Sequence, residues 1–204
     1  MIYLYEDGLA GYEECGTGKY GQRVYAASDF IGDKFVICGG DGQSNCEMID
    51  ENGKQSLASH DRKYAASVKL NQSTILITGG MDSWNVFLKS TEFVTIDGST
   101  TGPNLNFKMT QHCMVKFKPN EILQIGGDYG ILTKTTWIID PKSELDMTEG
   151  PSMINARSGH SCGTVNDKYE NVLIIVAGGN FEGDYIEILN TTTMEKWVPG
   201  KTIQ

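Results

Sequence analysis

FVICGG, at residues 35–40, is a short apolar run that ends in two glycines, and three further runs of this kind follow. They are ILITGG at residues 75–80, ILQIGG at 122–127 and LIIVAGG at 173–179. Branched side chains suit a pleated strand, and glycine permits backbone angles that other residues resist, so each run predicts a buried strand that ends in a turn. Four such strands in one chain indicate a repeat protein.

The glycine pairs set the period of this repeat. They are Gly39 and Gly40, Gly79 and Gly80, Gly126 and Gly127, and Gly178 and Gly179. The first glycines of successive pairs are 40, 47 and 52 residues apart, which is within the range of propeller blades. The unequal spacing implies connecting loops of unequal length.

Each glycine strand lies in a similar sequence context. The preceding motifs are RVYAAS at 23–28, RKYAAS at 62–67, MTQHCM at 109–114 and RSGHSC at 157–162. A second strand-like segment follows each pair and ends at Asp or Asn, residues that favour a turn. His112 and His160 hold the same place in the motif, so we expect them to pack near the start of a blade rather than to bind a metal.

The order of these features resembles the kelch motif, with the fullest match at Arg157, His160, Ser161, the Gly178–Gly179 pair and Trp197. The resemblance covers residues 23–204 and implies an all-β, kelch-like β-propeller. This chain departs from the kelch pattern at Met109, which replaces the arginine of the third repeat, and in having an obvious blade tryptophan only in the last repeat.

The resemblance divides the chain into four blades at residues 23–61, 62–108, 109–156 and 157–204. Residues 1–22 resemble the third and fourth strands of a further blade, because YEDG at 5–8 is similar to DENG at 50–53. Either the N-terminal strands close a small ring, or the chain is part of a six- or seven-bladed ring. We favour the larger ring.

Composition narrows the classes of partner. The 204 residues are 39% hydrophobic, enough for a sizeable core, and no apolar run of about 18 residues predicts a membrane-spanning helix. The formal net charge of −9 argues against nucleic acid, whose affinity comes mainly from clustered Lys and Arg.

The sequence shows no catalytic constellation, no metal site and no cofactor motif. The doubled glycines lack the spacing of a nucleotide-binding loop, and the cysteines lack zinc-ligand spacing. We therefore expect a non-catalytic module that binds another protein. The alternative is a secreted propeller whose carbohydrate-related or copper-oxidase-like active site is completed outside this chain.

Partner binding is expected in the loops that join second to third strands and in those that join successive blades, since the kelch resemblance implies that both emerge on one face. Trp and Tyr are common in binding hot spots, and Trp84 is either an anchor or a lid over its own blade. The candidate binding residues are Trp84, Asn85, Asp128, Tyr129, Arg157, Asn180 and Phe181.

Five cysteines leave at least one unpaired within the chain. Cys38 and Cys46 flank a predicted hairpin loop, so they either form a disulfide or remain buried thiols. Two N-glycosylation motifs begin at Asn71 and Asn190 in predicted turns. Cytoplasmic and extracellular locations both stay open at this point.

Overall fold

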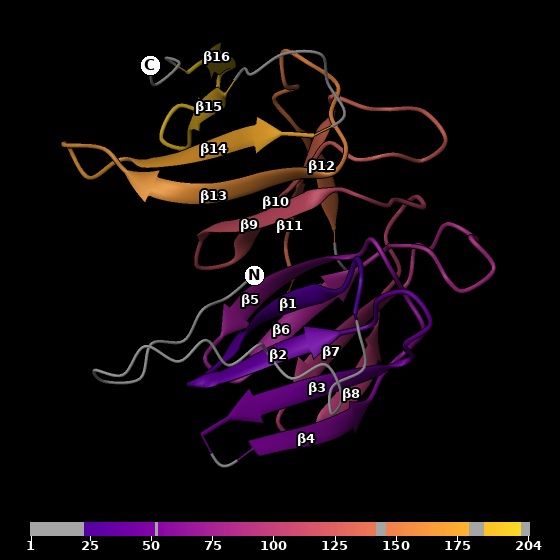
Figure 1. Cartoon of the computed structure of the whole chain (residues 1–204). Coiled ribbons are helices and arrows are strands. Elements are labelled where there is room, and N and C mark those ends of the chain that lie inside the picture. The colour runs from indigo at the N-terminus through magenta and orange to yellow at the C-terminus, as the bar shows by residue number, and fades with distance from the viewer. Residues whose placement is uncertain (1–22, 52, 142–145, 180–185, 201–204) are drawn as a thin grey trace, which may run out of the picture.

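The computed structural model describes residues 23–51, 53–141, 146–179 and 186–200, and its regular elements there are all β-strands (Figure 1). The all-β expectation is confirmed for these residues. The partial blade expected at residues 1–22 lies outside the described residues.

The first two sheets are four-stranded meanders in which each strand pairs antiparallel with the next. The strands of the first sheet are β1 (Ala27–Ile31), β2 (Lys34–Cys38), β3 (Asn45–Asp50) and β4 (Gly53–Ala58). Those of the second sheet are β5 (Ala66–Asn71), β6 (Thr74–Thr78), β7 (Thr91–Thr95) and β8 (Gly98–Gly102).

The third and fourth sheets repeat this antiparallel order. The third consists of β9 (Cys113–Lys118), β10 (Glu121–Ile125), β11 (Thr136–Ile139) and β12 (Met147–Gly150). The fourth consists of β13 (His160–Asn166), β14 (Val172–Gly178), β15 (Glu187–Asn190) and β16 (Trp197–Pro199). The four sheets lie within residues 23–61, 62–108, 109–156 and 157–204 respectively.

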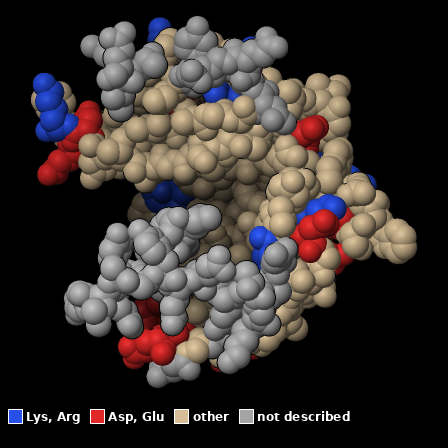
Figure 2. Space-filling model, in the orientation of Figure 1, with Lys and Arg blue, Asp and Glu red and all other residues tan. Residues whose placement is uncertain are grey.

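The sheets are arranged as a four-bladed β-propeller. The first strands of successive sheets contact one another, β1 with β5, β5 with β9 and β9 with β13, and form the inner wall of the arrangement. The second strands all end on the same side, to the right in Figure 1, where the loops that follow the first three glycine pairs emerge. Figure 2 shows the hollow at the centre of this arrangement.

The core lies between the blades. We call the face of a blade that carries the residues one and three positions before its first glycine the forward face, and the opposite face the backward face. Val36 and Cys38, on the forward face of the first blade, pack against Ile75 and Ile77, on the backward face of the second. The same pairing joins the second blade to the third and the third to the fourth.

Trp197 belongs to the last of these interfaces. Its side chain is buried in the cluster between the third and fourth blades, and its indole Nε1 donates a hydrogen bond of 2.7 Å to the carbonyl of Pro151. A buried tryptophan usually finds such a partner for its N–H group. Trp197 therefore ties the outermost strand of the fourth blade to the segment that enters that blade.

Candidate functional site

Arg62 and Glu92 form an ion pair that is fully buried inside the second blade. Arg62 Nη2 lies 2.7 Å from Glu92 Oε1, and Arg62 Nε donates to the same oxygen at 2.8 Å. Arg62 Nη1 donates to the carbonyls of Gly79 and Ser90, at 2.8 and 3.1 Å. The guanidinium thus fastens the end of β6 to the segment before β7.

The environment of Glu92 keeps its carboxylate ionised. Burial alone would raise the pKa of Glu92, but the charge of Arg62 and hydrogen bonds from Ser59 and His60 hold the pKa below its ordinary value. A buried charge is tolerated when it is paired and hydrogen-bonded in this way. The pair is a structural element of the blade rather than a reactive group.

The pair recurs in the first and fourth blades, where Glu47 faces Arg23 and Glu187 faces Arg157. In the third blade, Met109 replaces the arginine and Trp137 stands where the glutamate would be. The sequence analysis recognised the arginines and missed the glutamates. The available signal was one position in the third strand of each blade, opposite the residue two places before the first glycine. It is Glu where the repeat begins with Arg and Trp where it begins with Met.

The glycine pairs lie where successive blades meet. The backbone N–H groups of Gly40, Gly80 and Gly127 donate to the carbonyls of Arg62, Met109 and Arg157 in the next blade, at 2.8–2.9 Å. Gly79 has φ +59°, and a Cβ atom there would collide with the carbonyl oxygen of Met109. The glycines are therefore required by close contact between blades and not by a bound phosphate.

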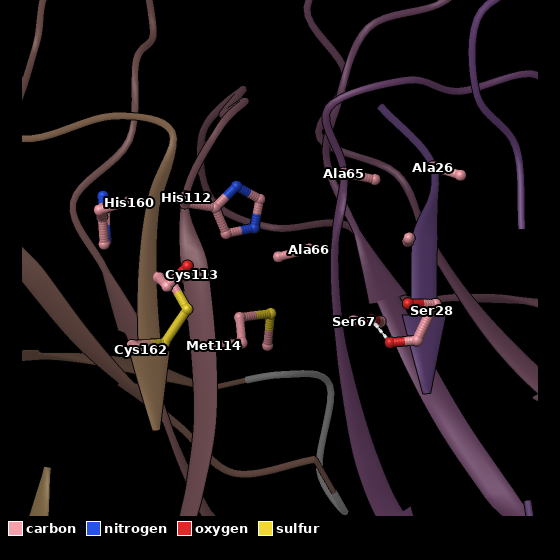
Figure 3. Close-up of a pocket in the computed structure, with 12 residues that line it drawn as sticks. Ala26, Ser28, Ala65, Ala66, Ser67, His112, Cys113, Met114, His160 and Cys162 are labelled. Carbon is pink, nitrogen blue, oxygen red and sulfur yellow. Dashed lines mark hydrogen bonds between the residues drawn. A yellow bond between two sulfur atoms is a disulfide. The ribbon is translucent and has the colours of Figure 1, made fainter. Parts of the chain in front are cut away.

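A cavity of about 380 Å³ opens between the inner strands. Three consecutive residues from each blade line it, at positions 26–28, 65–67, 112–114 and 160–162. Figure 3 shows Met114 beside the disulfide Cys113–Cys162, and the hydrogen bond from Ser67 to the carbonyl of Ser28. The lining combines small residues, hydroxyls and sulfur atoms and carries no Lys, Arg, Asp or Glu.

His112 and His160 are buried at the edge of this cavity. Burial lowers the pKa of His112 to about 3, with a smaller effect from His160. Burial, with the Arg157 charge, lowers the pKa of His160 to about 4. His112 Nε2 lies 2.8 Å from Thr78 Oγ1 of the second blade, so the neutral ring links two blades. This geometry supports the packing role that the repeat position predicts.

Two disulfides join described cysteines. Cys38 and Cys46, the pair considered from the sequence, are directly opposite in the β2–β3 ladder and are bonded, with Cα atoms 4.0 Å apart. Cys113 and Cys162 join β9 to β13, with Cα atoms 6.0 Å apart, and so connect two blades covalently. Sequence reasoning missed this second bridge, and Cys15 lies outside the described residues.

The described residues contain no group of three or more His, Cys, Asp or Glu side chains that could hold a metal ion. The titratable groups with the largest shifts, His112 and His160, are buried among structural contacts. The loops after the glycine pairs offer a more accessible candidate site.

Trp84 lies at the tip of the β6–β7 loop and is 84% exposed. Asp82 shapes this loop, because its Oδ1 accepts hydrogen bonds from the backbone N–H groups of Trp84 and Val86, both at 2.9 Å. Asn85, between them, adopts φ +60° and donates its backbone N–H to the carbonyl of Asp82. The indole is therefore held outward by a defined turn.

The same loop is fastened at its base. The backbone N–H of Ser83 donates to Asp61 Oδ2 at 2.8 Å, and Met81 forms isolated β-bridges with Lys63 and Phe87. These contacts reach the segment that joins the first two blades. They hold the loop in place while the indole stays exposed. An exposed indole covers little of its own blade, which favours an anchor over a lid.

The β10–β11 loop lies next to the Trp84 loop, and Gly130 approaches the ring of Phe87. Asp128 accepts a hydrogen bond of 2.7 Å from the N–H of Gly130, and its backbone pairs with Thr110. The loop exposes Tyr129, Ile131 and Leu132, of which Ile131 is 68% exposed. We call Trp84, Val86, Tyr129, Ile131 and Leu132 together the loop surface.

Trp84 and Tyr129, both expected at the site, belong to the loop surface, and Asn85 and Asp128 lie in the same two loops. The remaining expected residues are not part of this set. Arg157 is fully buried by its bonds to Glu187 and Gly178, so its expected role as a contact residue does not agree with its position. Asn180 and Phe181 lie outside the described residues. Val86, Ile131 and Leu132 were not expected, because an exposed aliphatic residue has no distinctive sequence pattern.

Comparisons with known proteins give no family for this chain, since neither a family model nor a curated protein matches it. A helix long and apolar enough to cross a membrane is absent from the part of the chain that the structure describes.

Proposed function

We propose that this protein is a non-catalytic propeller that binds a partner protein through the loop surface. The observation that carries the proposal is Trp84, an almost fully exposed indole held by hydrogen bonds from a fixed turn. Large rigid aromatic side chains contribute strongly to binding because they bury much area at a small entropic cost. Four further exposed apolar residues on two adjacent loops extend the patch.

The partner's chemistry follows from this surface. The centre of the patch is apolar, and the carboxylates of Asp61 and Asp82 lie at the base of the Trp84 loop. A matching partner presents an apolar pocket for the indole with basic or hydrogen-bond-donating groups at its rim. An interface with this anatomy, an apolar centre within a polar rim, is common among transient complexes.

The experiment compares two variants that remove a large exposed aromatic ring. Trp84→Ala removes the centre of the loop surface, whereas Tyr169→Ala removes a ring that is 72% exposed in the β13–β14 turn, at the other end of the strands. We expect both variants to unfold at the wild-type temperature, because both rings are largely exposed. Quantitative pull-down from the native source should show partners that the wild type and Tyr169→Ala retain and Trp84→Ala loses.

The outcomes separate the alternatives for Trp84. Lost stability with unchanged binding of the folded fraction makes the indole a lid and overturns the proposal. Equal loss of partners in both variants would show non-specific adhesion of exposed rings, which also overturns it. Binding weakened at least tenfold in Trp84→Ala alone, about 1.4 kcal/mol, supports an anchor.

We also propose that the blades are of the kelch type and belong to a larger ring. The three interfaces on view each pair a forward face with a backward face, and the forward residues Val36, Leu76 and Leu123 are fully buried there. The equivalent Ile175 of the fourth blade is partly exposed. On the same face, Ala177 is also partly exposed and Val165 is 45% exposed.

At the other end of the arrangement, the backward face of the first blade is partly exposed. On the backward face of the first blade, Phe35 and Ile37 are partly exposed, while the equivalent residues in the second blade, Ile75 and Ile77, are fully buried. The forward face of the fourth blade and the backward face of the first therefore each lack the partner face that covers the equivalent residues in the other blades. A further blade of the same repeat has both of the faces required.

Glycine substitutions test the larger ring in the protein as isolated from its source. Gly79→Ala places a Cβ against the next blade, whereas Gly178, with φ +74°, has no described atom within 4 Å of an added Cβ. Gly42→Ala is the control for backbone strain alone, because Gly42 has φ +71° and lies in open space. If a further blade covers the fourth, Gly178→Ala destabilises as strongly as Gly79→Ala; a cost equal to that of Gly42→Ala refutes the larger ring.

The second candidate function is a secreted propeller with a carbohydrate-related or copper-oxidase-like site completed outside this chain. The two disulfides favour its oxidising location, since such bonds persist mainly in secreted and extracellular proteins. Metal analysis of the purified protein from its source distinguishes the two: stoichiometric copper supports an oxidase.

A further inference from the structure

The turn between β5 and β6 contains the acceptor motif Asn71-Gln72-Ser73, and all three residues are exposed. Asn71 Oδ1 accepts two hydrogen bonds, one from the backbone N–H of Ser73 at 2.8 Å and one from its hydroxyl at 2.9 Å. These bonds draw electron density toward the oxygen and orient the amide. The acceptor nitrogen and the hydroxyl that the motif requires are thus held together at the surface.

The second motif in the chain has a different environment. Asn190 is only partly exposed, Thr191 is buried, and the Thr192 hydroxyl donates to Asn171 Oδ1 at 3.2 Å instead of to Asn190. Thr191 also donates its backbone N–H and its hydroxyl to the carbonyl of Val172. A bulky substituent fits this packed turn less well than the exposed turn at Asn71.

The compartment follows from the cysteines. A chain that keeps one disulfide within a hairpin and another between blades folds in an oxidising environment, because reducing compartments remove such bonds. In eukaryotic cells, proteins acquire structural disulfides along the secretory route, where Asn-x-Ser/Thr motifs are modified. The motif, its exposure and the disulfides are independent observations, and they agree on Asn71.

We propose that Asn71 carries an N-linked oligosaccharide. In the transfer, Asn71 Nδ2 attacks the anomeric carbon of an oligosaccharide linked to a polyprenyl pyrophosphate. The new N-glycosidic bond forms as the bond from that carbon to the pyrophosphate oxygen breaks. The polyprenyl pyrophosphate leaves with the electron pair, and one amide proton passes to a base of the transferring enzyme. The reaction involves no change of oxidation state.

The position of the glycan is compatible with a free loop surface. Asn71 stands at the opposite end of the second blade from the Gly79–Gly80 pair, and the five-residue strand β6 between them spans about 17 Å. The oligosaccharide would therefore cover the face of the propeller remote from Trp84. The proposal does not depend on partner binding.

The test uses protein from its native source, with free thiols blocked before digestion. Trypsin releases residues 70–89, which contain Asn71, and residues 169–196, which contain Asn190. Peptide N-glycosidase in ¹⁸O-labelled water converts a glycosylated Asn to labelled Asp, so mass spectrometry identifies the occupied site. We expect the label at residue 71, with most molecules modified there and fewer at residue 190.

Variants expressed by the same secretory route provide the controls. Asn71→Gln and Ser73→Ala should each lose the oligosaccharide on peptide 70–89, the second without touching the acceptor, whereas Asn190→Gln should keep it. An unmodified Asn71 in native protein overturns the proposal, whether the four bridged cysteines are oxidised or free. Label that persists at residue 71 in Ser73→Ala would also overturn it, because the transfer would not use this motif.

Discussion

Replacing Glu92 by Gln tests whether the buried ion pair holds the second blade together. The substitution preserves shape, and its single amide oxygen can take the place of Oε1, which accepts from Arg62 Nε and the backbone N–H of His60. It removes the negative charge opposite Arg62, whose side chain is completely buried. The guanidinium then remains in the blade without a counter-charge.

The expected loss follows from that burial. Breaking a buried ion pair by removing one partner costs about 3–5 kcal/mol, and we expect the lower end because the amide oxygen of Gln keeps part of the hydrogen bonds. For a protein of this size the corresponding fall in melting temperature is about 6–12 °C. Glu121→Gln is the matched control, since the Lys118–Glu121 pair is exposed and should contribute less than about 1 kcal/mol.

Urea unfolding at pH 7, with the disulfides intact, measures both variants. A double variant, Arg62→Met with Glu92→Gln, imitates the uncharged solution that the third blade already uses at Met109. We expect the double variant to be more stable than Glu92→Gln alone, because no uncompensated charge remains. A cost below 1 kcal/mol for Glu92→Gln, or a double variant whose loss equals the sum of the two single losses, would refute the reasoning.

Two further predictions concern pH and the disulfides. Because burial lowers the folded pKa of His112 to about 3 and of His160 to about 4, protons bind the unfolded chain first as the pH falls below about 6.5, and stability is lost from there down to the folded pKa values. Two such histidines should cost about 4 kcal/mol between pH 7.5 and 5 in urea unfolding, and a slope that His112→Gln leaves unchanged would contradict this. Replacing Cys113 and Cys162 by Ala should cost about 4 kcal/mol, more than the roughly 2.5 kcal/mol for Cys38 and Cys46, because the bridged residues are 49 rather than 8 positions apart. Equal losses in calorimetry would show that loop length does not govern the effect.

The sequence predicted the strands because each sheet is built from neighbours along the chain. Runs such as residues 75–80 carry their own strand signal, and the turns beside them contain Gly, Asn or Asp. Each strand pairs with the next, so no distant pairing had to be inferred. The four-bladed arrangement then follows from the repetition of one local pattern.

Contacts between distant residues were harder to predict. The Cys113–Cys162 bridge depends on how two blades stack, and no local sequence pattern predicts it. The burial of Arg157 depends on Glu187, which lies in the third strand of the blade. The exposure of Trp84 could not be predicted because it depends on the loop turn at Asp82 and the tie to Asp61.

The bridge between β9 and β13 also has a mechanical consequence. When the oxidised chain is pulled from its two ends, tension passes through the sulfur atoms and bypasses the 49 positions that separate Cys113 from Cys162. At about 3.4 Å per extended residue, this withholds about 170 Å of contour length from extension. The four strands of the third blade therefore bear no direct load, and force extends the chain only outside that loop until the bond is reduced.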